Sequence, residues 1–205
     1  MAAFNRYCGV EVEEISPREV AELFPLARTD DLLAGFHVAG DGRVNPVDVT
    51  QSLARGARQY GVTIAQGVTV ADVIVVDGVV RGVVTDHGVI ECEYVVNAAG
   101  MWARQLAARS AVSVPLQAAE HYYLITEAMA GLDPACPVIE DPANFGYYRE
   151  EGGGLMIGLF ESHCAPWRVE GIPDDASFLS LPPDWDRMSP YVEAAMSRVP
   201  GAADI

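Results

Sequence analysis

"ECEYVVNAAGMWA", residues 91–103, is the stretch that decides the fold class. A short apolar run ending at Val96 leads into Asn97, and three small residues follow before a predicted helix, namely Ala98, Ala99 and Gly100. Small residues at a turn between a strand and a helix let another group approach the backbone, where free N–H groups and the helix dipole favour an anion. The same residues also suit close packing between the two elements. The corner alone leaves both interpretations open.

Upstream of this corner, the sequence predicts two helices and a strand. Ser16, Pro17 and Glu19 form the pattern of a capping box with proline in the first helical turn. Asn45 and Pro46 repeat the cap-and-proline pattern, and apolar residues follow at helical spacing up to Tyr60, namely Val49, Leu53 and Ala57. Gly61 is well placed to end this helix. Residues 62–65 are then expected to form a strand.

The hydrophobic period changes to two after residue 72. Residues 73–76 and 79–85 flank Asp77-Gly78, a strong hairpin signal, and a second turn at 86–88 leads to residues 89–92. The sequence therefore predicts an antiparallel meander. This meander is expected to lie beside a parallel sheet, and a strand at 94–97 and a helix ending near Ser110 are expected to follow it.

The last part of the chain favours an antiparallel sheet. Residues 121–126 are predicted to form a strand, and residues 145–149 and 155–160 a hairpin. Ser189-Pro190 is predicted to start a helix that Pro200 ends. The expected fold class is thus α/β and α+β. We expect an N-terminal helical segment over 1–40, packing with the last domain, a partial α/β domain with a meander over 41–111, and an antiparallel-sheet domain over 112–205.

Composition excludes several classes of protein. Half of the 205 residues are hydrophobic, which indicates a globular chain. Acidic residues outnumber basic ones by 29 to 13, and the net charge of −16 argues against nucleic acid or an anionic membrane surface as a partner. No apolar run has the length of a membrane span, and the N-terminus shows no export signal. The cysteines lack metal-binding spacing, so we expect reduced thiols in an intracellular protein and no metal site.

The order of elements resembles the D-amino-acid-oxidase-like FAD-dependent oxidoreductases, and within them the match is closest to the dimethylglycine and sarcosine dehydrogenases. The resemblance covers residues 11–200 nearly without a gap. Its clearest stretches are "VEEISPREVAELFPL", "GDGRVNPVDVTQSLARGARQYG", "ECEYVVNAAGMWARQL", "AEHYYLITE", "YYREEGGGLMIGLFE" and "PWRVEGIPDD".

The resemblance implies FAD as the cofactor and assigns residues to it. Ala98, Ala99 and Gly100 would lie against the FAD pyrophosphate, and Trp102 just beyond them toward the flavin. Val70 would contact the adenine through its backbone. Core packing is the alternative role for Val70 and Trp102. The dinucleotide fingerprint Gly-x-Gly-x-x-Gly after a first strand is absent from the 205 residues, so the chain is expected to be an internal piece of a longer enzyme that by itself retains no FAD and no activity.

The resemblance also implies a catalytic pair, His121 and Tyr147, beside the bound amine. An N-methyl amine must lose its ammonium proton before hydride leaves carbon, and an imidazole or phenol within hydrogen-bond reach assists this step. Arg149 is a candidate for binding the substrate carboxylate. The alternative for Arg149 is an ordinary ion pair with Glu150, Glu151 or Glu161. Pattern alone favours packed, hydrogen-bonded residues for His121 and Tyr147.

The implied function is oxidation of an N-methyl amino acid of the sarcosine or dimethylglycine type, with hydride passing from the N-methyl carbon to flavin. The alternative is a non-catalytic regulatory subunit of the same fold, like that of pyruvate dehydrogenase phosphatase; an unrelated acidic binding module is a weaker one. The electron acceptor and the choice of amine stay open. A homo-oligomer is a further expectation, as are the cytoplasm for a bacterial chain and the mitochondrial matrix for a eukaryotic one.

Overall fold

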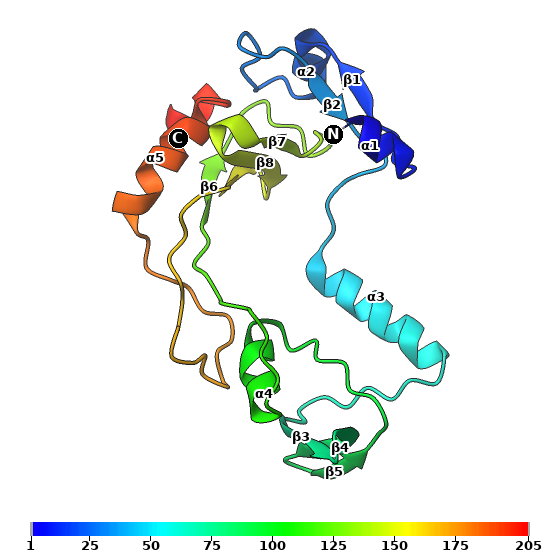
Figure 1. Cartoon of the computed structure of the whole chain (residues 1–205). Helices are drawn as coiled ribbons and strands as arrows, with labels where there is room; N and C mark the ends of the chain where they lie inside the picture. The colour runs from blue at the N-terminus through cyan, green and yellow to red at the C-terminus, as the bar shows by residue number, and fades with distance from the viewer. Residues whose placement is uncertain (1, 205) are drawn as a thin grey trace. The chain divides into compact units, whose positions relative to one another are not determined.

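The computed structural model describes residues 2–204, which form two compact units. The first unit comprises the residues up to Val44, His121–His163 and the residues from Pro182 onward; the second comprises Asn45–Glu120 and Cys164–Leu181. Figure 1 labels most helices and strands of both. The domain boundaries expected from the sequence, at 40/41 and 111/112, stay predictions.

A four-stranded antiparallel sheet forms the centre of the first unit. Its strand order is β6-β9-β8-β7, and the strands span Tyr123–Ala128, Gly154–Leu159, Gly146–Glu151 and Ile139–Asp141. The predicted hairpin of residues 145–149 and 155–160 is therefore confirmed as β8 and β9. A 3₁₀ turn, η2 (Pro142–Asn144), connects β7 to β8.

One face of this sheet packs against helix α5 (Trp185–Met196), beside which it lies in Figure 1. Tyr148 of β8 and Ile157 of β9 are fully buried there, together with Ala195 of the helix. The Tyr148 hydroxyl donates a hydrogen bond of 2.6 Å to the Ala195 carbonyl, so the one polar atom of this buried ring is satisfied. Val199, before the 3₁₀ turn η3 (Pro200–Asp204), and Phe24 complete the core.

The N-terminal segment of the first unit contains two helices and a strand pair. Its elements are α1 (Ala2–Tyr7), β1 (Glu13–Ile15), α2 (Pro17–Leu23) and β2 (Gly35–His37), and β1 pairs with β2 antiparallel. The predicted capping box is confirmed. The Ser16 hydroxyl accepts from the Glu19 N–H, and the Glu19 carboxylate accepts from the Ser16 N–H.

The second unit contains the predicted helix and meander. Helix α3 (Pro46–Gln59) begins at the Asn45 cap, whose side chain accepts from the Val47 and Asp48 amides. The meander consists of β3 (Val70–Val76), β4 (Val79–Thr85) and β5 (Gly88–Glu91), paired in that order. Both residues of the β3–β4 turn, Asp77 and Gly78, have positive φ, as the predicted hairpin turn requires. The 3₁₀ turn η1 (Gly100–Trp102) then leads into helix α4 (Ala103–Arg109).

Two predicted strands do not form. Residues 62–65 and 94–97 have no strand pairing, and every strand pair among residues 2–204 is antiparallel, so the expected parallel sheet is not present in this part of the chain. Val62, Tyr94 and Val96 are instead exposed. Their apolar sequences suit strands, but a strand needs a neighbour to satisfy its backbone hydrogen bonds, and they pair with no strand among the described residues. The expectation was wrong because it used local pattern alone.

Two predicted element boundaries are also wrong. Strand β6 begins at Tyr123 rather than His121. Helix α5 begins after Asp184, whose side chain accepts from the Arg187 N–H, and it contains Pro190 instead of starting there. Burial of Met188 and Val192 on one helix face outweighs the backbone hydrogen bond that Pro190 cannot make.

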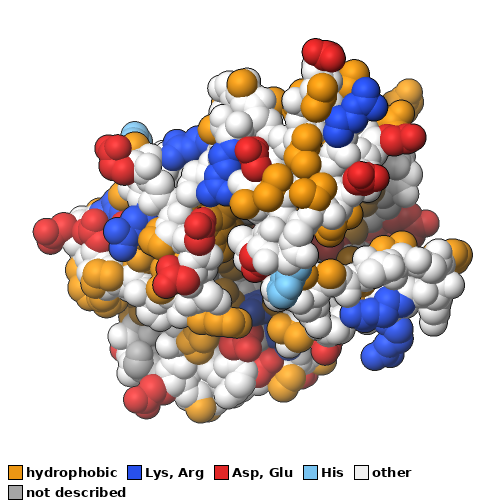
Figure 2. All heavy atoms as spheres, turned by 90° about the horizontal axis from the view of Figure 1, so that it is seen from below, with side chains coloured by type: hydrophobic (Ala, Val, Ile, Leu, Met, Phe, Trp, Pro, Cys, Tyr) orange, Lys and Arg blue, Asp and Glu red, His pale blue; other side chains and the backbone are white. Residues whose placement is uncertain are grey.

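Hydrophobic side chains remain exposed on both units. Figure 2 shows one face of the molecule, on which they lie between acidic and basic side chains. In the second unit, Val47, Leu53 and Tyr60 of the α3 region are each more than half exposed. Among residues 2–204, no helix combines the length and the apolar character that crossing a bilayer requires.

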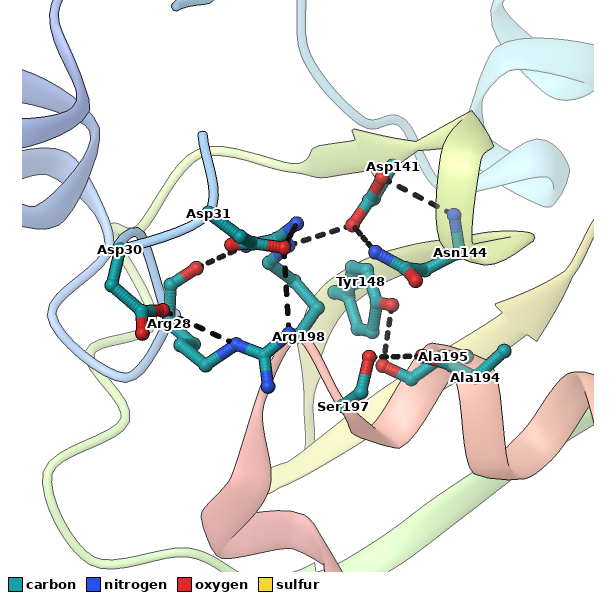
Figure 3. A network of polar contacts seen from close by, with 10 residues as sticks. All are labelled: Arg28, Asp30, Asp31, Asp141, Asn144, Tyr148, Ala194, Ala195, Ser197 and Arg198. Atoms are coloured by element: carbon teal, nitrogen blue, oxygen red, sulfur yellow. Dashed lines mark hydrogen bonds and ion pairs between the residues drawn. The ribbon is translucent and has the colours of Figure 1, made fainter. Parts of the chain in front are cut away.

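A buried arginine joins three segments of the first unit (Figure 3). Arg198 is 3% exposed, and its guanidinium binds Asp141 Oδ2 at 2.6 Å and Asp31 Oδ1 at 2.7 Å. It also donates to the Arg28 carbonyl. Burial alone would raise the pKa of Asp141, but hydrogen bonds from Asn144 and Arg198 outweigh it and hold this pKa below its usual value. Asp31, bound by the same guanidinium, has a pKa lowered to about 2.

Replacing Arg198 with Met should destabilise the first unit, because Asp141 would keep its charge in a nearly buried site without its counterion. The expected loss is about 3–5 kcal/mol in the free energy of unfolding, measured by urea denaturation. The pKa of Asp141 is depressed in the fold, so this loss should be full above a pH of about 3.9 and shrink as the pH falls through the folded value.

Arg18→Met is the matched control. Arg18 pairs with Glu22 on the surface, with 88% of its side chain exposed, and its removal should change stability by less than about 0.5 kcal/mol. Equal losses of unfolding free energy in the two variants would show that the buried network stabilises the first unit no more than a surface ion pair does.

Candidate functional site

The sheet face opposite α5 carries a row of aromatic side chains. Tyr123 on β6 and Tyr147 on β8 both pair in register with Gly158 on the strand between them. Residues directly opposite one another in an antiparallel sheet point to the same face. The side chains of Tyr123 and Tyr147 therefore flank Gly158, on the face that the α5 core does not use.

Gly158 is the position that makes room for the Tyr147 ring. A Cβ atom built on Gly158 would lie 1.7 Å from Cζ of Tyr147, so the ring lies directly over the glycine backbone. Phe160, two residues further along the same face, has its ring centroid 5.1 Å from that of Tyr147, with the ring planes at 44°. Tyr123 and Phe160 are 57% and 40% exposed. The row thus presents a partly open aromatic surface.

His121 lies just before β6 and is held by a carboxylate. Its Nδ1 is 2.9 Å from Oε2 of Glu161, the residue after Phe160. The Glu161 side chain is only 6% exposed, whereas 53% of the His121 side chain is exposed. One segment, Phe160-Glu161, therefore contacts Tyr147 through its ring and His121 through its carboxylate.

The Tyr147 hydroxyl keeps its proton at neutral pH. Burial raises the pKa of Tyr147. The positive charge of Arg149 lowers this pKa, whereas Glu161 and Tyr123 raise it further. Tyr147 is therefore a hydrogen-bond donor at the open face.

Arg149 lies on the same face as Tyr147, one row further along the sheet. Its Nη2 is 2.7 Å from Oε2 of Glu151, and its Nε donates to the Met156 sulfur. The ion pair with Glu151 is one of the ordinary pairings expected from the sequence. Binding of a substrate carboxylate by Arg149 stays a prediction.

In the second unit, Asn97 shapes the small-residue corner. Its Oδ1 accepts from the Ala99 N–H at 3.2 Å, and its Nδ2 donates to the Ala103 carbonyl at 3.0 Å. The chain thereby turns from the extended segment into η1. Gly100 has φ +54°, and no atom lies within 4 Å of a Cβ built on it. Ala98 and Gly100 are exposed, so the backbone of this corner is open to a close approach.

The two residues next to this corner have structural partners. Val70 is the first residue of β3 and pairs with Thr85. Trp102 is half-buried, and its indole N–H donates to the Pro173 carbonyl at 2.9 Å. Packing accounts for the observed position of Trp102, and a contact of Val70 with a ligand through its backbone stays a prediction.

Ala98, Ala99 and Gly100 fit a group that lies against the backbone. The corner has no side chain larger than a methyl group, and its glycine adopts a left-handed conformation that other residues rarely adopt. These are the features that a phosphate of a dinucleotide needs from a backbone turn. The small side chains and the exposed backbone therefore agree with the cofactor expected for this corner, although the Ala99 N–H already donates to Asn97.

Three residues of the candidate site were missed from the sequence. The sequence pattern offers Glu161 only as an ion-pair partner of Arg149 and assigns no role in the site to Gly158 or Tyr123. The alternation in "GLMIGLFE", residues 154–161, places Gly158 and Phe160 on one face and could have identified the aromatic row. No local signal connects Glu161 to His121, because they lie 40 positions apart.

The comparisons with known proteins concern the whole chain. A family model described as FAD dependent oxidoreductase matches residues 1–205. The chain is 36% identical over 195 residues to 4-methylaminobutanoate oxidase (formaldehyde-forming) of Paenarthrobacter nicotinovorans, covering 95% of the chain and 24% of that protein. It is 34% identical over 205 residues to human mitochondrial sarcosine dehydrogenase, covering 98% of the chain and 22% of that enzyme.

One of the similar proteins is named as a regulatory subunit rather than as an enzyme. The mitochondrial pyruvate dehydrogenase phosphatase regulatory subunit of Mus musculus is 38% identical over 195 residues, covering 94% of the chain and 22% of that protein. The chain thus spans about a quarter of the length of these relatives.

Solved structures agree on the fold. The L-proline dehydrogenase from P. horikoshii matches with a TM-score of 0.76 at 21% identity, covering 96% of this chain and 50% of that one. Glycine oxidase from Bacillus cereus matches with a TM-score of 0.63 at 20% identity, covering 99% and 51%. The mixed α/β fold class with antiparallel sheets is therefore confirmed.

Replacing Gly158 with Ala should displace the Tyr147 ring, because the added methyl group would occupy the position of the ring carbons. The strain expected of such overpacking is about 1–3 kcal/mol in the free energy of unfolding. The nuclear Overhauser contacts between the rings of Tyr147 and Phe160 should weaken or vanish. Gly40→Ala is the control, because a Cβ there meets no atom within 4 Å. Unchanged ring contacts and stability in Gly158→Ala would contradict the described packing.

Proposed function

The chain belongs to the FAD-dependent oxidoreductase family, whose cofactor is FAD, and from this premise we propose that it forms part of an enzyme that oxidises N-methyl amino acids. The substrate class we propose is of the sarcosine or dimethylglycine type. Relatives named sarcosine dehydrogenase and dimethylglycine dehydrogenase, the latter 34% identical in the rat, support this choice.

The observation that carries the proposal is the open face of the β6-β9-β8 sheet. It combines an exposed imidazole, His121, with a protonated phenol, Tyr147, and an aromatic surface. Aromatic faces attract an alkylammonium group by cation–π interaction. A secondary or tertiary amine is protonated at neutral pH, so a site that oxidises it needs both a surface for the cation and a base for its proton.

In this proposal, His121 accepts the ammonium proton and Tyr147 donates a hydrogen bond that orients the amine or its carboxylate. Arg149 is close enough to Tyr147 to affect its pKa, and its guanidinium can exchange Glu151 for a substrate carboxylate. FAD, when bound, supplies the acceptor for the hydride that leaves the N-methyl carbon. Ala98, Ala99 and Gly100 would hold its pyrophosphate, Val70 its adenine, and Trp102 would lie on the flavin side.

A non-catalytic regulatory role is the second candidate. The 38% identity to the pyruvate dehydrogenase phosphatase regulatory subunit is the observation that favours it. Such a subunit would need neither the proton acceptor nor the open aromatic surface. The two candidates therefore differ in what the loss of His121 does.

In the full-length protein, His121→Ala should slow the reduction of bound flavin by an N-methyl amine about 10²–10⁴-fold, the range for loss of a general base. Tyr147→Phe, which removes only the hydroxyl, should have a smaller effect in the same direction. FAD content, measured from the flavin absorbance, should not change. Rapid-mixing experiments with sarcosine and dimethylglycine would measure the rates.

His87→Ala is the control for this experiment, because His87 lies in the β4–β5 turn with 70% of its side chain exposed. Reduction at the parent rate in His121→Ala would make His121 a packing residue. Absence of reduction in the unaltered protein by any N-methyl amine would favour the regulatory alternative.

The 205-residue chain by itself should bind FAD weakly and purify without colour. The Gly-x-Gly-x-x-Gly fingerprint, whose backbone amides would donate to the FAD pyrophosphate, is absent from the 205 residues, so those hydrogen bonds are lost. Absorbance spectra after gel filtration in excess FAD would test this. A yellow protein with near-stoichiometric flavin would show that the corner suffices.

A further inference from the structure

Glu161 is a nearly buried carboxylate beside the proposed proton acceptor. Its side chain is 6% exposed, and the ion pair recorded for it joins Oε2 to His121 Nδ1 at 2.9 Å. A carboxylate removed from water in this way needs a hydrogen-bond donor. The imidazole N–H is such a donor, so the contact stabilises one specific form of His121.

The direction of this hydrogen bond determines which ring nitrogen can react. A neutral imidazole carries one N–H donor and one acceptor nitrogen, and the partner of one nitrogen decides the role of the other. With the proton on Nδ1 donated to Glu161, the lone pair is on Nε2. About half of the His121 side chain is exposed, so this second nitrogen has access to the open face.

We propose that Glu161 is the positioning residue of the site, holding His121 with its proton on Nδ1 so that Nε2 is the acceptor for the proton of a substrate ammonium group. This inference rests on the function proposed above. The step breaks one N–H bond of the ammonium group, whose electron pair stays on the amine nitrogen. It forms one N–H bond at Nε2, and the resulting imidazolium is balanced by the Glu161 carboxylate. No further reactant is required.

Glu161 also acts on the second residue of the pair. Its negative charge helps to raise the pKa of Tyr147, after burial, and so keeps the phenol protonated. A single carboxylate thus favours an acceptor at His121 and a donor at Tyr147.

The histidine tautomer can be measured directly in the 205-residue chain without cofactor. Ring ¹⁵N spectra at a pH of about 8.5, where an unperturbed imidazole is neutral, distinguish Nδ1–H from Nε2–H. We expect His121 to be mainly Nδ1–H in the unaltered chain, and this form to fall below half in Glu161→Ala. His121→Gln assigns its signals among the four histidines.

Glu13→Gln is the matched control. Glu13 is another glutamate paired with a histidine Nδ1, at 4.0 Å from His37, and its side chain is 77% exposed. Its replacement should leave the His121 tautomer unchanged. An Nε2–H form of His121 in the unaltered chain would overturn the proposal, whether or not the Glu161 variants fold. An unchanged tautomer in folded Glu161→Ala would do the same.

The consequence for catalysis is tested in the full-length protein with sarcosine as the probe. Glu161→Gln should lower the limiting rate of flavin reduction about 10–100-fold, the usual cost of losing an orienting partner, with a smaller change in the sarcosine concentration at half-saturation. Glu161→Asp should restore part of the rate. In a His121→Gln background, Glu161→Gln should not slow flavin reduction further, because Glu161 acts through His121.

An equal loss in both backgrounds would show that Glu161 acts independently of His121 and would overturn the proposal. A failure of the proposed function looks different. The unaltered protein would then show no flavin reduction by N-methyl amines, while the tautomer measurement would still report whether Glu161 holds His121.

Discussion

The two-residue period of the β8–β9 hairpin is the constraint on which the first unit depends. Successive side chains of a strand point to opposite faces, so one hairpin supplies both the core and the candidate site. Tyr148 and Ile157 enter the core against α5, whereas Tyr147 and Gly158 lie on the open face. A shift of register by one residue would exchange the two sets. Stability and site geometry are therefore determined by the same pairing.

The buried network of Arg198 complements this hairpin. It connects Arg198, shortly after α5, to the end of β7 at Asp141 and to the N-terminal segment at Asp31, which lie 57 and 167 positions away along the chain. Such a network favours the meeting of these segments, since losing the pair would leave Arg198 or Asp141 as an unpaired charge in a nearly dry environment. The open face, by contrast, carries a histidine bound to a carboxylate and a phenol whose ring lies over a glycine.

Local pattern predicted the elements whose stability is local. The capping box at Ser16, the Asn45 cap and the Asp77-Gly78 hairpin are short-range arrangements, and each forms as expected. The strands predicted at 62–65 and 94–97 do not form. A strand depends on a paired neighbour, and the residues of the segment itself do not show whether that neighbour is present. The predicted start of α5 at Ser189-Pro190 was wrong because burial of Met188 and Val192 outweighed the preference of Pro190 for the first turn of a helix.

The sequence by itself determined the family, the antiparallel character of the sheet and the presence of a small-residue corner, because these follow from patterns within about twenty residues and from resemblance along the chain. It also identified His121, Tyr147 and Arg149 as candidates. Only the tertiary structure decided their partners. Glu161 meets His121, and Arg149 meets Glu151, through the pairing and termination of strands distant in sequence. Contacts of this kind depend on strand register and on side-chain packing, which no single segment of the sequence encodes.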